Sequence, residues 1–361
     1  MESALLHGGN LQAARRLFPD APEPFIDLST GVNPHSYPVP KLSSDVFAHL
    51  PEPAALDRLA ATAATVYGAP SRHHVVPAPG TQILLPLVMA LRPPGRAAVL
   101  GPTYEEFSRV ARLAGHEVAE VGDIGQLKSA DLAVVVNPNN PDGWIFNKRE
   151  LLDLADARRH REGLLVIDEA FMDVGPVGTS LCGEVARGDI VVLRSFGKFF
   201  GLGGLRLGFA LAAPNIAARL AAALGPWAVA GPAIAIGQTA LADAGWSKTM
   251  RERLEGEARR LDAVLVEAGI EVVGGTSLFR LVRTPVADRL FLHLGRAGIL
   301  VRRFPDHPAW LRIGLPGSEA AWDRLRVALV TFSSSHRSLA EAPNRTTGPD
   351  ERLNPPSRPR T

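Results

Sequence analysis

The stretch that decides the fold reads Ile190-Val191-Val192-Leu193-Arg194-Ser195-Phe196-Gly197-Lys198. Its first four residues are apolar and predict a buried strand, because a short apolar run that ends in turn residues is typical of a strand covered on both faces. Polar residues and a glycine follow at once and predict a turn. Lys198 is then expected just beyond the carboxyl end of a strand, where open α/β sheets bind ligands.

Working outward, four similar apolar runs each end in polar or turn residues: 97–100, 133–136, 164–167 and 207–211. Between them lie stretches with helical spacing, such as 106–113 and 148–160. Strands that alternate with helices predict an α/β fold with a mainly parallel sheet covered by helices on both faces. We therefore expect a large α/β/α domain.

The pattern changes after about residue 214, to an alanine-rich helical segment and then a charged helix over 248–267. Shorter strand-like runs follow at 270–273, 278–282, 299–301 and 311–314, with a last helix from Ser318. These predict a small α+β domain. We expect an N-terminal arm over 1–45 that contributes to the small domain and the substrate site, a large domain over 46–245, a small domain over 246–336, and a disordered tail over 337–361, which is rich in Pro and Arg.

Composition excludes several classes of protein. The 361 residues carry 39 Lys+Arg and 37 Asp+Glu, a net charge of +2, which argues against a polybasic nucleic-acid binder. The single cysteine, Cys182, excludes an internal disulfide and a zinc site built from several cysteines, so we expect a cytoplasmic protein and no metal site. The first residues lack the features of a secretory signal, and Gly-Pro pairs interrupt the uncharged stretch 220–242, so we expect no membrane partner.

Chemistry-bearing residues follow each predicted strand. They are Tyr104 after the first run, Asn140 after the second, Asp168 after the third, and Ser195 and Lys198 after the fourth. A lysine among Phe199, Phe200 and glycines would be partly desolvated, which lowers the pKa of its amine and suits it to form a Schiff base. A carboxylate such as Asp168 is the partner that a pyridinium nitrogen needs. The combination predicts pyridoxal phosphate (PLP) as cofactor.

Phosphate donors are expected at the turn Gly80-Thr81-Gln82, which opens an apolar run at a predicted helix N-terminus, with Ser195 and Arg206 completing the cup. Tyr104 can stack on the ring and Asn140 can donate to its phenolic oxygen. Taken singly, each residue has an ordinary explanation as a surface charge, a helix cap or a turn. Their joint order is far more specific.

The strings Asn140-Pro141-Asp142-Gly143, Asp168-Glu169-Ala170-Phe171 and Ser195-Phe196-Gly197-Lys198, followed by Arg206-Leu207-Gly208, resemble the aspartate-aminotransferase superfamily of PLP enzymes (classes I and II, fold type I) over roughly residues 25–332. An S-x-x-K serine enzyme is a poor alternative, because its companion motifs are missing.

This resemblance implies roles for individual residues. It implies that Lys198 holds PLP, that Asp168 pairs with the ring nitrogen and that Arg312 binds the substrate α-carboxylate. Asn140 would contact the ring hydroxyl, next to the substrate. Tyr67 would reach the phosphate of the neighbouring subunit, which implies a homodimer.

The front end narrows the resemblance. The strings His7-Gly8-Gly9-Asn10 and Ile26-Asp27-Leu28-Ser29-Thr30-Gly31-Val32-Asn33-Pro34 resemble the threonine-phosphate decarboxylases of cobalamin biosynthesis. These enzymes release carbon dioxide from L-threonine O-3-phosphate and give (R)-1-amino-2-propanol phosphate. Phe171 stands where most aminotransferases have a tyrosine, which suits the decarboxylase branch. The alternative is an aminotransferase similar to histidinol-phosphate aminotransferase.

The substrate of such an enzyme is a small phosphorylated amino acid, whose dianion needs charge-assisted donors. We expect the phosphate to lie near His7, Asn33 and Arg302, with Gly31 in the same front segment. His7 has the ordinary explanation of an unstructured terminal residue, and Arg302 that of a solvated edge charge.

Overall fold

The computed structural model describes residues 8–340. A seven-stranded sheet forms the centre of the large domain, in the order β2-β8-β7-β6-β5-β3-β4. Only β8 among these strands runs antiparallel to its neighbours. The strands are β2 (Val75–Ala78), β3 (Arg96–Leu100), β4 (Glu117–Val121), β5 (Leu132–Val136), β6 (Leu164–Asp168), β7 (Ile190–Ser195) and β8 (Gly208–Leu211). The predicted α/β fold with a mainly parallel sheet is confirmed.

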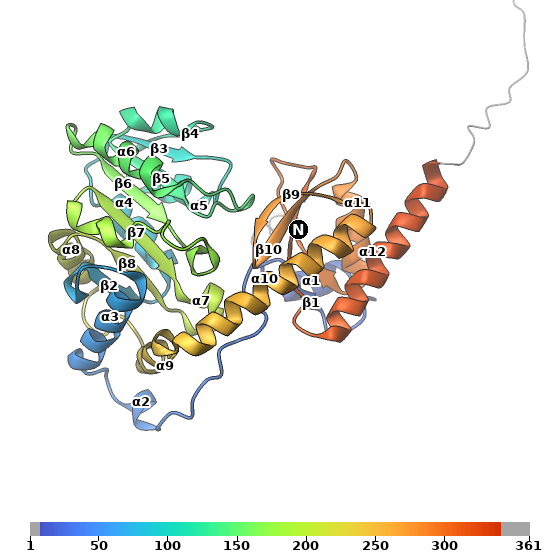
Figure 1. The fold of residues 1–361 in the computed structure, drawn as a ribbon, viewed down its shortest axis with the longest axis horizontal. Coiled ribbons are helices and arrows are strands. Elements are labelled where there is room, and N and C mark those ends of the chain that lie inside the picture. The colour runs from blue at the N-terminus through green and yellow to red at the C-terminus, as the bar shows by residue number, and fades with distance from the viewer. Residues whose placement is uncertain (1–7, 341–361) are drawn as a thin grey trace, which may run out of the picture.

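Helices cover both faces of this sheet (Figure 1). The core on one face includes side chains from α4 (Thr81–Met89), α5 (Glu106–Leu113) and α8 (Pro214–Leu224). The core on the other face includes side chains from α3 (Pro53–Tyr67), α6 (Lys148–Arg159) and α9 (Gly231–Ala242). The stretch 220–242 thus contains the end of α8 and the whole of α9, two helices separated by a turn, as expected. Among residues 8–340, no helix has the length and apolar character that a membrane crossing requires.

The small domain has an antiparallel sheet in the order β12-β13-β10-β9. Its strands are β9 (Glu271–Thr276), β10 (Phe279–Arg283), β12 (Arg302–Arg303) and β13 (Trp310–Gly314), accompanied by α11 (Ala287–Arg296) and α12 (Glu319–Ala340). In addition, β1 (Ile26–Asp27) from the front of the chain pairs in parallel with β11 (Ile299–Leu300). The N-terminal arm therefore supplies a strand to the small domain.

The helix α10 (Ala244–Glu267) runs from the large domain to the small one (Figure 1). Asp243 caps it by accepting a hydrogen bond from the backbone nitrogen of Trp246. The arm carries the short helices α1 (Leu11–Leu17) and α2 (Asp45–Ala48), and α7 (Phe196–Phe199) follows β7. The predicted domain boundaries stay predictions.

Four strands and one boundary differ from expectation. We did not predict β1, β2, β4 or β12. β1 and β12 are only two residues long, β2 contains Pro77, which argues against a strand, and β4 is an edge strand with two glutamates. Helix α12 continues to Ala340, into the tail predicted to be disordered. Residues 341–361 of that tail lie outside the described residues.

Candidate active site

Ten of the predicted ligand-binding residues line one cavity of about 750 Å³ at the carboxyl ends of the parallel strands. Its walls come from the large domain, the small domain and the arm. The lining includes Thr81, Gln82, Tyr104, Asn140, Asp168, Ser195, Lys198, Arg206, Arg302 and Arg312. Residues far apart in the sequence are thus brought together by the parallel sheet, whose strand ends all meet at one edge.

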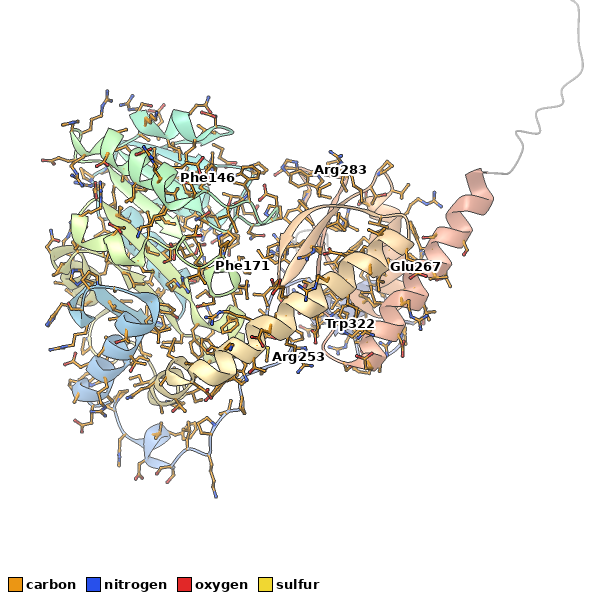
Figure 2. All side chains as sticks on the ribbon, in the orientation of Figure 1. Phe146, Phe171, Arg253, Glu267, Arg283 and Trp322 are labelled. Atoms are coloured by element: carbon orange, nitrogen blue, oxygen red, sulfur yellow. The ribbon has the colours of Figure 1, made fainter. Side chains whose placement is uncertain are left out.

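Lys198 lies in α7, immediately after β7. Its Nζ donates to the Thr30 carbonyl oxygen at 3.0 Å and lies 5.6 Å from the centroid of the Phe171 ring. Burial, followed by the positive charge of Arg312, lowers the pKa of this amine to about 8. Phe171, and with it the Lys198 amine, lies on the side of the large domain that faces the small domain (Figure 2). The lowered pKa has a chemical consequence. A substantial fraction of Lys198 is therefore neutral near pH 8 and able to act as a nucleophile.

Asp168 is the last residue of β6 and is 8% exposed. Its Oδ1 accepts a hydrogen bond from the Ala170 backbone nitrogen at 3.0 Å. Burial nevertheless raises the pKa of the carboxyl to about 7, against the opposing effects of that hydrogen bond and of Lys198. A buried carboxylate that is costly to ionise is well suited to a cationic partner, such as a protonated ring nitrogen.

The helix α4 presents its N-terminus to the cavity and offers an anion site. Gly80, its N-cap, has a φ of 83°, and a Cβ at this position would lie 2.7 Å from Nη2 of Arg206. The positive φ favours glycine here, and a larger residue would also displace the end of the Arg206 side chain. Arg206 and the free amides of the helix end make a cradle suited to a phosphate. Gly80 itself lies behind this cradle, whereas Thr81 and Ser195 line the cavity.

Two side chains of this wall are linked to each other. The Tyr104 hydroxyl donates to Oε1 of Gln82 at 3.3 Å, and Nε2 of Gln82 donates to Glu106 at 2.8 Å. Burial raises the pKa of Tyr104 to about 12, so the phenol stays neutral. These bonds orient Tyr104 and Gln82 within the wall before any ligand binds.

Arg312, in β13, is buried but incompletely paired. Its Nη1 donates to Oδ1 of Asn140 and its Nη2 to the Ser29 carbonyl oxygen, both at 2.6 Å. Its Nε is buried without a hydrogen-bond partner among the described residues. Burial, and secondarily the charge of Arg302, lowers the pKa of Arg312 to about 9. Because no carboxylate of residues 8–340 bonds to it directly, this guanidinium is available to an anionic ligand.

Arg302 lines the same cavity, with a side chain that is 13% exposed. Its nearest carboxylate, Glu105, is 4.0 Å away, and its Nε is buried without a hydrogen-bond partner in the part of the chain described. Burial lowers the pKa of Arg302. Two weakly compensated guanidinium groups in one cavity suit a ligand with two anionic groups.

Two predicted substrate contacts lie behind the wall. Asn33 is 1% exposed; its Nδ2 donates to the Phe199 carbonyl and its Oδ1 accepts from the His35 backbone nitrogen. Its amide nitrogen thus bonds to the Lys198 loop and its amide oxygen to the arm, and Asn33 does not line the cavity, so its contact with a substrate phosphate stays a prediction. Gly31 has a φ of 62° and does not line the cavity; a Cβ at this position would lie 3.0 Å from the Phe279 ring and 3.5 Å from the Phe171 ring. His7 lies outside the described residues.

Tyr67, predicted to contact the phosphate of a neighbouring subunit, lies in the interior of the large domain. The residue ends α3 but is only 7% exposed, because its ring packs against Phe209 and beneath the Arg194 guanidinium, 4.4 Å from the ring centroid. Burial raises the pKa of its hydroxyl well above the usual range. The Tyr67 side chain thus packs in the core of its own chain, and its contact with the phosphate of a neighbouring subunit stays a prediction.

Sequence reasoning missed a buried ionic cluster directly behind the cavity, consisting of Glu169, Asp173 and Arg194. Arg194 donates to Glu169 at 3.0 Å and to Asp173 at 2.5 Å. Glu169 also accepts from the Ser180 hydroxyl and the Leu181 backbone nitrogen. The available signal was position: Glu169 and Arg194 each adjoin a predicted site residue, Asp168 and Ser195.

Comparison with known proteins agrees with this geometry. Residues 25–329 match the model of the family described as aminotransferase class I and II. The chain belongs to this family. It is 42% identical to a threonine-phosphate decarboxylase of Pseudomonas aeruginosa, over 91% of this chain and 98% of that protein. It is 40% identical to one from a Sinorhizobium species, over 91% of this chain and 99% of the relative.

Solved structures of aminotransferase-family members share the fold. The histidinol-phosphate aminotransferase of Sinorhizobium meliloti, in complex with pyridoxal-5'-phosphate, has a TM-score of 0.77 at 20% identity and covers 90% of this chain and 94% of that one. The L-threonine-O-3-phosphate decarboxylase of Porphyromonas gingivalis has a TM-score of 0.70 at 23% identity, covering 86% and 99%. At such identities the likeness establishes the fold, which is that of PLP-dependent enzymes of fold type I.

Proposed function

We propose that this chain is a PLP-dependent threonine-phosphate decarboxylase. It would release carbon dioxide from L-threonine O-3-phosphate and give (R)-1-amino-2-propanol phosphate for cobalamin biosynthesis. The observation that carries the proposal is the 40–42% identity to two threonine-phosphate decarboxylases over 91% of this chain. The cavity supports it, because a lysine with a lowered pKa, a buried carboxylate and two weakly compensated guanidinium groups face the same space.

The residues present fit the cofactor. Lys198 would hold PLP, Asp168 would pair with the ring nitrogen, Tyr104 would stack on the ring and Asn140 would donate to its phenolic oxygen through the amide nitrogen. The cradle of Thr81, Gln82, Ser195 and Arg206, with Gly80 behind it, would hold the phosphate. When bound, PLP supplies an electron-withdrawing ring that accepts the electrons of a bond broken at the substrate Cα.

The chain's own residues select which bond breaks. Arg312 would bind the α-carboxylate and Arg302 the substrate phosphate, so that the two anchors fix the direction in which the carboxylate leaves. Lys198, with a pKa of about 8, can hold a proton near neutral pH and deliver it to Cα after carbon dioxide is lost. Phe171 presents an apolar ring to the amine and offers it no hydrogen bond.

The alternative is an aminotransferase. It is supported by 30% identity to a histidinol-phosphate aminotransferase of Citrifermentans bemidjiense, over 78% of this chain and 84% of that protein. In that reaction Lys198 would remove a proton from Cα, and a keto acid would have to accept the amino group. The position of Lys198 suits either reaction, so the substrate anchors decide between them.

We also propose a cytoplasmic homodimer. Phe47 and Leu50, at and just after α2, are 69% and 66% exposed, and large exposed apolar side chains are typical of association surfaces. Light scattering on the purified protein tests the dimer: a mass close to 38.5 kDa, that of one chain, would contradict it.

The deciding experiment supplies the PLP-loaded protein with L-threonine O-3-phosphate and follows carbon dioxide and amino transfer to a keto acid separately. Carbon dioxide release without a keto acid is the expected result. Amino transfer that depends on a keto acid, with no carbon dioxide, would establish the alternative. A protein that stays colourless after incubation with PLP would contradict both reactions.

A further inference from the structure

Two segments of the chain cross between the large and the small domain. The first is the arm: residues 26–28 bond to the small domain, while residues 33–37 bond to the loop that carries Lys198. The second is α10, whose first turn packs through Trp246 on Phe199 and Phe200 and whose later part contacts β9 and β10. Figure 1 shows both segments passing between the domains.

The first crossing holds two proposed active-site cations on adjacent peptide groups. The Ser29 carbonyl accepts from Nη2 of Arg312 at 2.6 Å, and the next carbonyl, that of Thr30, accepts from Nζ of Lys198 at 3.0 Å. Arg312 belongs to the small domain and Lys198 to the large one. This short piece of backbone therefore sets the spacing between the proposed carboxylate anchor and the amine.

The arm continues along the Lys198 loop and is bonded to it at several points. The Asn33 backbone nitrogen donates to the Lys198 carbonyl at 2.9 Å, and its side chain donates to the Phe199 carbonyl at 2.7 Å. The Tyr37 backbone nitrogen donates to the Phe200 carbonyl at 2.8 Å. Any shift of the arm is therefore transmitted to the peptide of Lys198 itself.

Side chains also tie the two crossings to each other. At the start of α10, the Tyr37 hydroxyl donates to Oδ2 of Asp243 at 3.2 Å and the Tyr37 ring lies 5.1 Å from that of Trp246.

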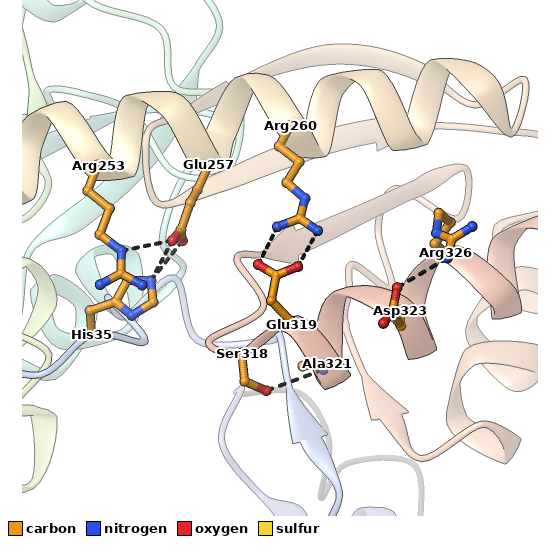
Figure 3. A network of polar contacts seen from close by, with 9 residues as sticks. All are labelled: His35, Arg253, Glu257, Arg260, Ser318, Glu319, Ala321, Asp323 and Arg326. Carbon is orange, nitrogen blue, oxygen red and sulfur yellow. Dashed lines mark hydrogen bonds and ion pairs between the residues drawn. The ribbon is translucent and has the colours of Figure 1, made fainter.

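A second tie, farther along α10, is a pair of titratable side chains. Nε2 of His35, in the arm, lies 2.8 Å from both carboxylate oxygens of Glu257, in the middle of α10 (Figure 3). A carboxylate only accepts, so Nε2 is the donor. The two side chains are 10% and 16% exposed, and Arg253 also donates to Glu257 at 3.0 Å. The pair is thus largely shielded from water, where a hydrogen bond to a charged group is strongest.

We propose that His35 and Glu257 are positioning residues, which fix the arm against α10 and thereby set the placement of Arg312 relative to Lys198. This inference rests on the proposed function, because it assigns the choice of the broken bond to the distance and direction between the carboxylate anchor and the amine. A looser arm lets the carboxylate leave its required direction, which lowers the rate of carbon dioxide release and favours the competing proton removal at Cα.

The test compares four variants of the PLP-loaded enzyme. His35→Phe removes the donor but keeps a ring, His35→Gln keeps a donor, and Glu257→Gln removes the charge of the acceptor. Arg260→Gln is the matched control, because it breaks a bidentate pair with Glu319 that also joins α10 to another segment (Figure 3). Among the described residues, Arg260 forms hydrogen bonds with Glu319 and a cation–π contact with Trp322, both outside the arm. Thermal midpoints show whether each variant is folded.

Three quantities are measured: kcat for carbon dioxide release, the ratio of amino transfer to carbon dioxide release, and the pH titration of the visible absorbance of the bound cofactor. We expect His35→Phe and Glu257→Gln to lower kcat about tenfold, to raise the ratio, and to move the titration midpoint by roughly half a pH unit. His35→Gln should recover most of the loss, and Arg260→Gln should resemble the wild type.

The inference would be overturned if Arg260→Gln and His35→Phe had equal effects. It would also be overturned if the absorbance titration were unchanged in both His35→Phe and Glu257→Gln. The proposed function fails separately, if the wild type releases no carbon dioxide from L-threonine O-3-phosphate. The absorbance titration needs no substrate, so it tests the role of the His35–Glu257 pair even in that case.

Discussion

The charged residues at the ends of β6 and β7 form two groups: one faces the cavity and the other lies behind it. The two groups differ in whether their charges are paired. Asp168 and Lys198 face the cavity, and burial moves the pKa of each toward its neutral form. Behind the cavity wall, Arg194 forms hydrogen-bonded ion pairs with Glu169 and Asp173, so these charges are paired within the protein. The comparison teaches that the compensated cluster holds the strand ends in place, whereas the uncompensated residues keep their binding capacity for a ligand.

The largest expected effect comes from Lys198→Ala, which removes the amine from the cavity side. We expect no detectable turnover and no yellow colour after incubation with PLP, since the group that would form the Schiff base is gone. Absorbance spectra and carbon dioxide release measure this. Lys248→Ala, at an exposed position, is the control and should behave as the wild type. A yellow, active Lys198→Ala protein would remove Lys198 from the centre of the site.

Asp168→Asn should weaken PLP binding by roughly 2–5 kcal/mol, since it removes one partner of a proposed buried charge pair. The same substitution should stabilise the protein when no cofactor is bound. The pKa of Asp168 is raised from 3.8 to about 7, so its contribution to stability is full below pH 3.8 and is lost as the pH rises through 7.

An asparagine at this position would not ionise, so the Asp168→Asn protein does not lose this stability as the pH rises. Without cofactor, its free energy of unfolding relative to the wild type should therefore increase from pH 5 to pH 8. Urea unfolding at both pH values, together with PLP titration, measures the two effects. A variant that binds PLP as tightly as the wild type would contradict the role of Asp168.

Glu169→Gln tests the compensated side. Removing the charge of a fully buried partner should destabilise the protein by about 3 kcal/mol, because Arg194 loses one of its two carboxylates. The kcat of the folded fraction should change little. Glu271→Gln breaks the exposed pair with Arg283 and should cost less than about 1 kcal/mol. If Glu169→Gln instead left stability unchanged and abolished turnover, the division between the two sides would be wrong.

Tyr67→Phe should have the smallest effect. The hydroxyl is buried without a hydrogen bond of normal geometry, while the ring contacts with Arg194 and Phe209 are retained, so the free energy of unfolding should change by less than about 1 kcal/mol. PLP affinity, measured by titration, should be unchanged. A marked loss of affinity would instead support the phosphate contact expected from the sequence.

Apolar runs predicted the five central strands, because a buried parallel strand is written as a continuous apolar segment. The residues that follow these strands supplied several side chains of the cavity lining, including Asp168 and Lys198, whereas other lining residues, such as Ser29, Arg109 and His307, were not predicted. Other features lay beyond sequence patterns. Asn33 has a side chain that could bind a ligand, but its amide nitrogen donates to the backbone of the Lys198 loop instead. The compensation of Arg194 by Glu169 and Asp173 depends on side-chain packing, which spacing along the chain does not reveal.

The pairing of β1 with β11 has a consequence for synthesis. Ile26 leaves the ribosome early, whereas its partner Ile299 is made near the end of the chain. Contacts between such distant residues form late and slow folding, because a long loop must close first. The arm that holds Lys198 and Arg312 on neighbouring carbonyls can therefore dock only after the small domain has been made, so we expect prematurely terminated chains to lack a complete catalytic site.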